Sequence, residues 1–347
     1  MSRGRAIQRD NPTYKITTVS KVYCDVNKQR GPKWYDCENW ELPVESPEGI
    51  EIADWIGTGK YSDVFIGYRG TQKLALKIMK PVRPLKYNRE AKILFNLKNG
   101  PNIIQLYGIV QNQDTSQYTF VFEYTPNCDF TTLLQNFTDR EVKYYLFQLL
   151  RAIQYSHSNG IMHRDIKPQN IMYDRQTKKL RLIDWGLAEF YHPKQSYNIH
   201  VASRHYKAIE LLVDYQYYDY SVDIWGFGVT MAGIIFHRMP FFKGSDDFDM
   251  VAKITSVLGS EQFYKYLNKY GIDLPPEMEK NLNPKTKPKR WESFIQKGFE
   301  KLASPEAIDL ISKCIRYDHT ERITAEEALQ HPYFNDVRNE VQMRSFQ

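Results

Sequence analysis

Hydrophobic residues in the first part of the chain follow the spacing of β-strands. Alternating or continuous apolar runs cover residues 50–56, 74–79 and 120–123, with glycine and polar turns around them. Between the second and third runs, residues 87–97 have the spacing of a helix. This pattern predicts a small, strand-rich lobe with one helix over residues 50–124.

The later part of the chain changes to helical spacing. Residues 304–316 show it, and so do residues 139–158, with apolar positions at Val142, Leu146, Leu149, Leu150 and Ile153. The pattern predicts a larger helical lobe over residues 125–335, and therefore an α+β protein of two lobes. An N-terminal extension (residues 1–49) and a short tail (residues 336–347) lie outside the lobes.

A glycine-rich turn separates the first predicted strand from the next. Residues 57–64 read G-T-G-K-Y-S-D-V, with Ser62 where phosphate-binding turns usually have a third glycine. Glycine lets backbone N–H groups approach phosphate oxygens because it has no side chain. A single turn of this kind is weak evidence. The candidate nucleotide-binding residues here are Ile56, Gly57, Thr58, Gly59, Lys60, Tyr61, Ser62, Asp63 and Val64.

Lys77 lies inside an otherwise apolar strand that reads L-A-L-K-I-M. A buried ammonium group is costly unless an opposite charge pairs with it. The candidate partner is Glu90, in the following stretch of helical periodicity. Lys77 alone is equally compatible with a solvated lysine at a sheet edge. The order of glycine turn, strand lysine and helix glutamate favours a role in holding phosphates.

Two polar motifs follow one another in the middle of the chain. Residues 163–170 read H-R-D-I-K-P-Q-N, and D-W-G begins at Asp184. Phosphoryl transfer needs positioned charge rather than covalent chemistry. Asp165 can accept the proton of an attacking hydroxyl group, and Lys167 can neutralise the moving phosphoryl group. Asn170 and Asp184 can each hold a magnesium ion. The alternative, a polar loop between helices, is disfavoured by the number of specified positions.

Longer sequence blocks carry a resemblance to a known family. Residues 180–193 read L-R-L-I-D-W-G-L-A-E-F-Y-H-P, and V-A-S-R, K-R-W-E and H-P-Y-F begin at positions 201, 289 and 331. Together with the motifs above, these blocks resemble the catalytic (alpha) subunits of casein kinase II, within the eukaryotic protein kinase superfamily. The likeness extends from about residue 20 to residue 335.

The resemblance implies a bilobal protein kinase fold and a constitutively active serine/threonine kinase. Such an enzyme uses Mg²⁺ and transfers the γ-phosphate of ATP, with GTP as an alternative donor, to Ser or Thr hydroxyl groups in acidic sequence contexts. A catalytically impaired pseudokinase acting as a scaffold is the alternative, because Ser62 and Ile209 depart from the usual motifs. Retention of the polar site residues argues against it.

The resemblance also implies an adenine pocket at the junction of the lobes. Backbone groups of Glu123 and Thr125 would face the base, with Phe122 at the back of the pocket. The residues that would enclose the ring are Val64, Ala75, Ile104, Met172 and Ile183. Each of these apolar residues is also compatible with an ordinary position in the core.

Three charged residues are expected to stabilise the fold rather than to act on a ligand. Asp223 precedes an apolar helical run and would hold the catalytic loop from beneath. Arg322 has a candidate buried partner in Glu210. Loss of either member would leave a charge buried alone, at a cost of about 3–5 kcal/mol.

Residues 20–48 of the N-terminal extension carry four aromatic residues that predict packing on the body: Tyr23, Trp34, Tyr35 and Trp40. Residues 1–19 are expected to be flexible. The resemblance places the extension against the activation segment (residues 184–210) and implies that it keeps this segment active. Arg164 would then not need to hold a phosphorylated residue. The alternative is that Ser196 is a phosphorylation site.

The resemblance implies that acidic protein substrates contact basic residues along a groove. The candidates are Lys60, Arg83, Lys86, His200, Arg204 and Lys207. His200 stands where the family has an arginine, and the family's lysine run is reduced here to R-P-L-K, which predicts a weaker or more pH-dependent acidic preference. A dimeric regulatory (beta) subunit is expected to bind the small lobe in a heterotetramer, through Ile52, Phe65 and Leu76.

The composition of the chain restricts its expected partners and its expected cellular location. The net charge of +6 is mild, and no nucleic-acid-binding motif accompanies it, so we expect no direct nucleic-acid partner. No apolar stretch reaches the ~20 residues of a membrane span, and the start of the chain does not resemble a signal peptide. The four cysteines form no C-x-x-C pair and are expected to be reduced thiols, in the cytoplasm and nucleus.

Overall fold

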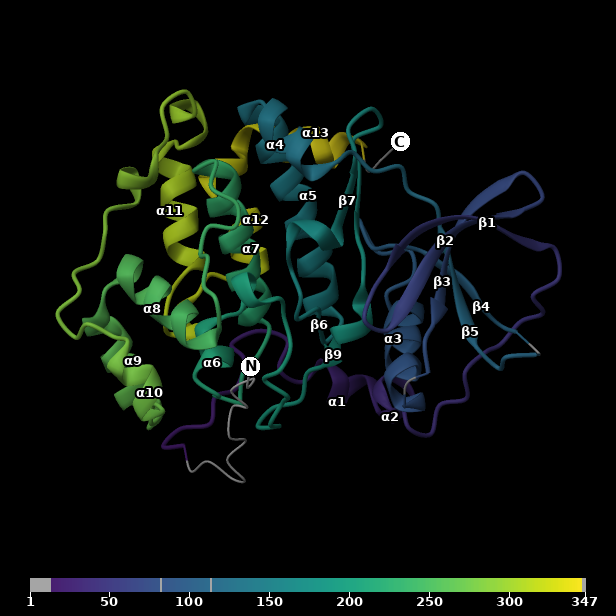
Figure 1. Cartoon of the computed structure of the whole chain (residues 1–347), viewed down its shortest axis with the longest axis horizontal. Helices are drawn as coiled ribbons and strands as arrows, with labels where there is room; N and C mark the ends of the chain where they lie inside the picture. The colour runs from purple at the N-terminus through teal and green to yellow at the C-terminus, as the bar shows by residue number, and fades with distance from the viewer. Residues whose placement is uncertain (1–13, 82, 113, 345–347) are drawn as a thin grey trace.

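The computed structural model of the chain describes residues 14–81, 83–112 and 114–344 and shows two lobes of different composition (Figure 1). A twisted sheet with one long helix forms the smaller lobe, on the right of the figure, and a helical body forms the larger one. This architecture confirms the α+β, two-lobed fold expected from the change in hydrophobic spacing.

The small lobe contains a five-stranded antiparallel sheet in the order β1-β2-β3-β5-β4. Its strands are β1 (Ile50–Thr58), β2 (Ser62–Arg69), β3 (Gln72–Met79), β4 (Leu106–Gln111) and β5 (Tyr118–Glu123). Helix α3 (Pro84–Asn96) follows β3, and proline at its first position suits a helix start because no N–H group is needed there. The glycine-rich turn joins β1 to β2.

The pleat of β3 separates its residues between two faces of the sheet. Leu74 and Leu76 lie on the outer face, in a small buried cluster with Val110 and Val121. Ala75 and Lys77 therefore point to the opposite face, because successive side chains alternate along a strand. Helix α3 lies on this inner face, since Glu90 of α3 contacts Lys77.

The large lobe is built around two buried helices, α5 (Asp139–Ser158) and α7 (Ser221–Ile235). Helix α5 has the predicted bounds and begins with a capping box, in which Thr138 and Glu141 satisfy each other's backbone N–H groups. Every residue of α7 is buried, as expected for a continuous apolar run. The other helices of this lobe are α4 (Phe130–Asn136), α6 (Ile209–Leu212), α8 (Asp247–Leu258), α9 (Ser260–Tyr270), α10 (Pro276–Lys280), α11 (Pro305–Cys314), α12 (Ala325–Leu329) and α13 (Asn335–Arg344).

Two short antiparallel ribbons lie where the lobes meet. Strand β6 (Ile161–Met162) pairs with β9 (Glu189–Phe190), and β7 (Ile171–Asp174) pairs with β8 (Lys179–Leu182). These pairings hold the loops after β6 and β8 side by side, although the sequence separates them by about twenty residues. Among the helices described, none is long and apolar enough to cross a membrane.

The predicted ion pair between Arg322 and Glu210 is present and fully enclosed. Two nitrogens of the guanidinium group bind the two carboxylate oxygens at 2.6 and 2.7 Å, and neither side chain is exposed. Arg322 also donates to the backbone carbonyl of Ser221 at the start of α7. The pair therefore ties the end of the activation segment to α7 and to the C-terminal part of the lobe.

The N-terminal extension packs on the large lobe, on α3 and on the activation segment. Its helices α1 (Val26–Arg30) and α2 (Pro32–Tyr35) lie beneath the junction of the lobes in Figure 1. Thr18 donates to the carbonyl of Tyr217 at 2.7 Å, and the N–H of Ser20 donates to the Tyr191 hydroxyl at 2.7 Å. The expectation of flexibility is therefore wrong for residues 14–19, whose polar groups find partners on the lobe. Residues 1–13 lie outside the described residues.

Candidate active site

The loop after β6 carries the H-R-D motif and is fixed from below by Asp223 of α7. One carboxylate oxygen of Asp223 accepts the N–H of His163 at 2.8 Å, and the other accepts the N–H of Arg164 at 2.7 Å. Arg164 has φ +66°, which a side-chain-bearing residue adopts only when its surroundings hold it there. Burial disfavours the charge of Asp223, but hydrogen bonding by His157 outweighs this and lowers the pKa of the carboxyl group.

Asp165 lies next to Lys167 and Asn170 in the loop, as their spacing predicted. The Lys167 ammonium is 2.7 Å from one carboxylate oxygen of Asp165, and the Asn170 amide donates to the same oxygen at 3.0 Å. The other oxygen accepts the N–H of Ser203 at 2.8 Å. Asp165 is thus a buried carboxylate held by three donors, in position to receive a proton from a hydroxyl group.

Ser203 is a site residue that the sequence analysis did not assign. Its hydroxyl group lies 2.6 Å from the Lys167 ammonium, and its N–H binds Asp165. The residue belongs to the V-A-S-R block of the activation segment. That block, with one of the few hydroxyl side chains of the segment, was the available signal, but nothing in it indicated a contact with Asp165, which lies 38 residues away.

The predicted pair between Lys77 and Glu90 joins β3 to α3 at 2.6 Å. The same ammonium group lies 3.3 Å from Asp184 of the D-W-G motif. Burial opposes the charge of Lys77, but the two carboxylates raise its pKa above the ordinary value. Burial likewise opposes ionisation of Asp184, and Lys77 lowers its pKa. Lys77 therefore joins three segments, which are β3, α3 and the D-W-G motif.

Gly186 and Trp185 explain why the D-W-G motif can approach α3 so closely. A Cβ atom at Gly186 would lie only 3.2 Å from a carboxylate oxygen of Glu90, so a larger residue would press on the ion pair. Trp185 is buried, packs edge-on against His163, and donates its indole N–H to the carbonyl of Leu182 at 3.1 Å. The indole thus anchors the motif, and Asp184 has φ +57° and a side chain that is half exposed.

The glycine-rich turn is closed by its own backbone and by a lysine that the sequence analysis did not assign. The N–H of Gly59 donates to the carbonyl of Ser62 at 2.8 Å. Lys80 binds the Thr58 hydroxyl group and the Gly59 carbonyl, each at 2.9 Å, and lies 3.1 Å from Asp63. Lys80 follows β3 directly, and its ammonium group contacts the end of β1, the turn and the start of β2. This lysine therefore connects the two strands that the turn joins.

Three of the residues predicted to line the adenine pocket, Val64, Ala75 and Phe122, share the inner face of the five-stranded sheet. Phe122 pairs with Ala75 across β3 and β5, and Val64 pairs with Lys77 across β2 and β3. Cross-strand partners in an antiparallel sheet point to the same side. Phe122 and Ile104 are buried and Met172 and Ile183 are half-buried, while Ile56 is exposed.

Glu123 and Thr125 follow β5 at the connection between the lobes. The Glu123 side chain turns away to Lys179 and Arg181, at 2.7 and 2.5 Å, and its N–H donates to the carbonyl of Gln105. If the Glu123 backbone contacts a base, its carbonyl group must make the contact. Thr125 is buried, and its hydroxyl group has no partner among the described residues.

The sequence matches the family model of the protein kinase domain over residues 50–334. The chain belongs to the protein kinase family. Protein kinases use ATP and Mg²⁺, and the paired lysine and glutamate, the H-R-D loop and the Asp184 motif described above are the parts that phosphoryl transfer requires.

The residues predicted to hold Mg²⁺ offer oxygen donors of the kind that this ion prefers. Asn170 contributes an amide and Asp184 a carboxylate that is half exposed toward solvent, and Mg²⁺ is usually bound by one or two protein carboxylates together with substrate phosphates. Over the described part of the chain, no group of three or more His, Cys, Asp or Glu residues could hold a metal ion alone. The kinase site is thus compatible with a metal ion that shares its ligands with a nucleotide.

The basic residues predicted to contact substrate fall into two groups in the kinase. One group borders the glycine-rich turn: Lys60 and Lys86 both lie over the ring of Tyr61, and Arg83 is exposed before α3. The other group lies in the activation segment, where His200 and Arg204 are exposed. Lys207 differs from the rest because its ammonium group lies 2.8 Å from the carboxylate of Asp247 in α8.

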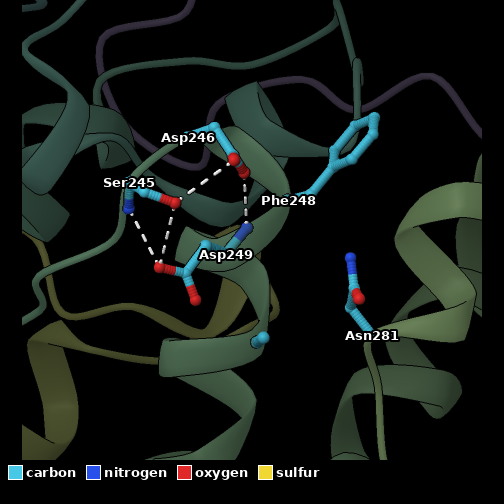
Figure 2. Close-up of a pocket in the computed structure, with 6 residues that line it drawn as sticks. Ser245, Asp246, Phe248, Asp249 and Asn281 are labelled. Carbon is cyan, nitrogen blue, oxygen red and sulfur yellow. Dashed lines mark hydrogen bonds between the residues drawn. The ribbon is translucent and has the colours of Figure 1, made fainter.

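The kinase also has a cavity of about 460 Å³ beside the N-terminal end of α8 (Figure 2). Figure 2 shows Asp246 and Asp249 turned toward Ser245, with Phe248 and Asn281 on the other side. Asp246 accepts the N–H of Asp249 at 2.8 Å, and Asp249 accepts the N–H of Ser245 at 2.9 Å. These carboxylates therefore cap the start of α8.

Proposed function

We propose that this protein kinase is a serine/threonine kinase that transfers the γ-phosphate of ATP to protein hydroxyl groups. The observation that supports the proposal most directly is the carboxylate of Asp165, held by Lys167, Asn170 and Ser203. The resemblance to casein kinase II supports Ser and Thr as the acceptors.

Each polar residue of the site has a role that follows from its position. Asp165 orients the attacking hydroxyl group and takes its proton, and Lys167 lies beside it to offset the negative charge of the transferred group. Lys77, fixed by Glu90, presents a positive charge to phosphates beneath the glycine-rich turn. When bound, Mg²⁺ supplies further neutralisation of phosphate charge next to Asn170 and Asp184.

The proposal is tested with Asp165→Asn, which keeps the size of the side chain but removes most of its basicity. Transfer of labelled phosphate to a serine peptide should fall by about 10²–10⁴-fold, because general-base catalysis typically contributes that much. Affinity for ATP should stay close to that of the unmodified kinase. The same assay with GTP in place of ATP tests whether GTP is a second phosphate donor. Near-normal turnover in the variant, or no transfer by the unmodified protein, would reject the assigned role; the second result would favour a scaffold.

We further propose that the kinase is active without phosphorylation of its activation segment. Arg164, which phosphate-regulated kinases use to bind a phosphorylated residue, has partners of its own in the described chain. It donates to the carbonyl of Leu187 at 2.7 Å and to the Tyr218 hydroxyl at 3.0 Å, and lies 3.5 Å from Glu189. Glu189 is also 2.5 Å from Arg89 of α3, so carboxylate charge stands where a phosphate would otherwise be needed.

The N-terminal extension supports this proposal because it binds three parts of the active arrangement at once. The amide of Asn27 donates to the carbonyls of Gly160 and Tyr191, at 2.7 and 2.8 Å. The indole of Trp34 donates to the carbonyl of Asn159, and Asn96 of α3 donates to the carbonyl of Trp34. Helix α3, the end of α5 and the activation segment are thereby connected through one short segment.

Deletion of residues 1–40 tests the role of the extension. Activity of bacterially produced, unphosphorylated protein should drop at least tenfold with a lower melting temperature, because buried backbone carbonyls lose their donors. Deletion of residues 1–13 alone is the matched control and should change activity and melting temperature little. Full activity of the longer deletion would remove the proposed role.

We propose acidic substrates and a dimeric regulatory subunit as partners, with support from the resemblance and from the exposed basic residues of the groove. Ile52 is 58% exposed and Phe65 is half-buried, so both are available on the small lobe. Leu76 is fully buried in the outer-face cluster, so its expected role as a direct contact is wrong. Leu76 pairs with Phe65 across β2 and β3, and the Phe65 ring packs against the cluster that buries Leu76.

A further inference from the structure

The activation segment carries Lys207 close to the point where a substrate hydroxyl group must lie. Ser203 is joined to both Asp165 and Lys167, and only the short turn η3 (Arg204–Tyr206) separates it from Lys207. Such a turn rises about 2 Å per residue, and an extended peptide advances about 3.4 Å per residue. Four steps of about 2 Å place Lys207 ~8 Å along the chain from Ser203, a length of two to three peptide residues. The resemblance to casein kinase II matches Lys207 to a position that receives the residue just after the target hydroxyl group.

Lys207 is already engaged by a carboxylate of the kinase itself. Its ammonium nitrogen lies 2.8 Å from Asp247, and only 11% of the lysine side chain is exposed, against 41% of the aspartate. Asp247 is the first residue of α8, where the partial positive charge of the helix N-terminus favours a negative side chain. Burial of Lys207 and the helix N-terminus at Asp247 therefore both favour the ion pair.

Two further carboxylates lie close to this ion pair in the sequence. Asp246 and Asp249 flank Asp247, and the N–H of Ser245 donates to Asp249 (Figure 2) and lowers the pKa of its carboxyl group. Asp249 is itself paired with Lys253 at 3.5 Å, so among these acidic residues it is Asp247 that contacts Lys207. An acidic substrate residue would have to displace Asp247 from Lys207, or face like charge beside it.

We propose that Asp247 sets substrate specificity by neutralising Lys207, so that the residue just after the target hydroxyl group need not be acidic. This inference rests on the proposed serine/threonine kinase activity and refines its substrate class. Acidic preference then belongs to positions that face the exposed Arg204, His200 and the basic residues near the glycine-rich turn. Neutral or basic residues are accepted next to the target.

The test compares kcat/KM for three serine peptides that differ only in the residue after the serine, which is Asp, Ala or Lys. The unmodified kinase should treat the Asp and Ala peptides alike, within about twofold. Asp247→Asn frees the ammonium group, so the Asp-to-Ala ratio should rise about fivefold, as for an ion pair of the strongest exposed class. The gain should appear in KM, with kcat unchanged, because the contact is made equally before and during transfer.

Asp249→Asn is the charge-matched control, since it removes the same charge from the same helix without touching Lys207. It should leave the Asp-to-Ala ratio as it is. Adding Lys207→Met to Asp247→Asn should cancel the gain, which identifies the freed lysine as its source. Asp247→Ser serves as a second release variant, because Asp246 is the N-cap of α8 and stays in place.

The outcomes separate the inference from the proposed function. A strong preference of the unmodified kinase for Asp at this position, or an unchanged ratio in both release variants, overturns the inference while the kinase activity stands. Absence of transfer to all three peptides overturns the proposed function, and the inference with it. A ratio that rises equally in Asp249→Asn shows a general charge effect and rejects the specific role of Asp247.

Discussion

Two networks of ion pairs use the same chemistry in opposite surroundings. In the candidate active site, Lys77 binds Glu90 and Asp184, and half of the Asp184 side chain is exposed. In the large lobe, Arg322 binds Glu210, and neither side chain is exposed. The first network has a carboxylate that is half exposed, so it can take up a ligand. The second network has its donors and acceptors directed inward and can only connect segments.

The comparison shows that burial decides whether loss of an ion pair affects mainly the stability of the fold or mainly the chemistry of the site. An enclosed pair gains little net stability over well-packed apolar residues, yet loss of one partner is severe because the other charge remains without water. A pair at the edge of a cleft costs less to disturb, and its removal is felt in chemistry rather than in folding. The predictions below separate these two kinds of effect.

The largest expected effect is on stability. Glu210→Gln should lower the free energy of unfolding by about 3–5 kcal/mol, because Arg322 would stay buried without a counter-charge. Urea unfolding at pH 7 measures the loss. The double variant with Arg322→Met should lose less than the single variant, since no charge is then left alone. Equal or greater loss in the double variant would contradict the description of the pair.

The next effect is on activity. Asp184→Asn should reduce phosphate transfer by about a thousandfold, as is typical for removal of a group that stabilises developing charge. Its melting temperature without nucleotide should change far less than that of Glu210→Gln, because the side chain is half exposed. Nucleotide affinity should also lose its dependence on Mg²⁺. A melting temperature as low as that of Glu210→Gln would remove the distinction between the networks.

A third ion pair lies between these extremes and predicts a pH effect. Burial disfavours the charge of Asp318, but Lys269, Thr320 and Tyr270 outweigh it and lower the pKa of the carboxyl group from 3.8 to about 2. The resulting stability is present above pH 4 and is lost as the pH falls toward 2. Asp318→Asn should cost roughly 1–2 kcal/mol at pH 7, less than the full shift because Lys269 is partly solvated. Urea unfolding at pH 5, 4 and 3 should show the difference between variant and parent narrowing.

The smallest effect concerns His200, which is exposed and which we propose to contact acidic substrates. His200→Arg places a permanent positive charge at this position, so the preference for acidic peptides should rise about twofold in the variant. The ratio of kcat/KM for paired acidic and neutral peptides measures it. Identical ratios for parent and variant would show that His200 does not contact substrate.

Several elements of the fold and two ion pairs were predicted from the sequence and are present in the structure. Helix α5 begins and ends at the predicted residues, and β3 and α3 occur where the spacing placed them. The expected pairs of Lys77 with Glu90 and of Arg322 with Glu210 are present. A charged group in an apolar segment requires a partner, so its sequence environment already indicates one.

By itself, the sequence determined the order of the elements and the main polar residues of the site, because periodicity and motif spacing are local properties. Only the tertiary structure decided that Ser203 binds Asp165, that Lys80 closes the glycine-rich turn, and that Asp247 occupies Lys207. It also decided that Leu76 is buried, because an alternating pattern does not say which face of a sheet is covered. A partly exposed charged side chain is compatible with solvent, so its local sequence does not specify which residue it pairs with. For Lys207, the packing of α8 against the activation segment decides that the partner is Asp247.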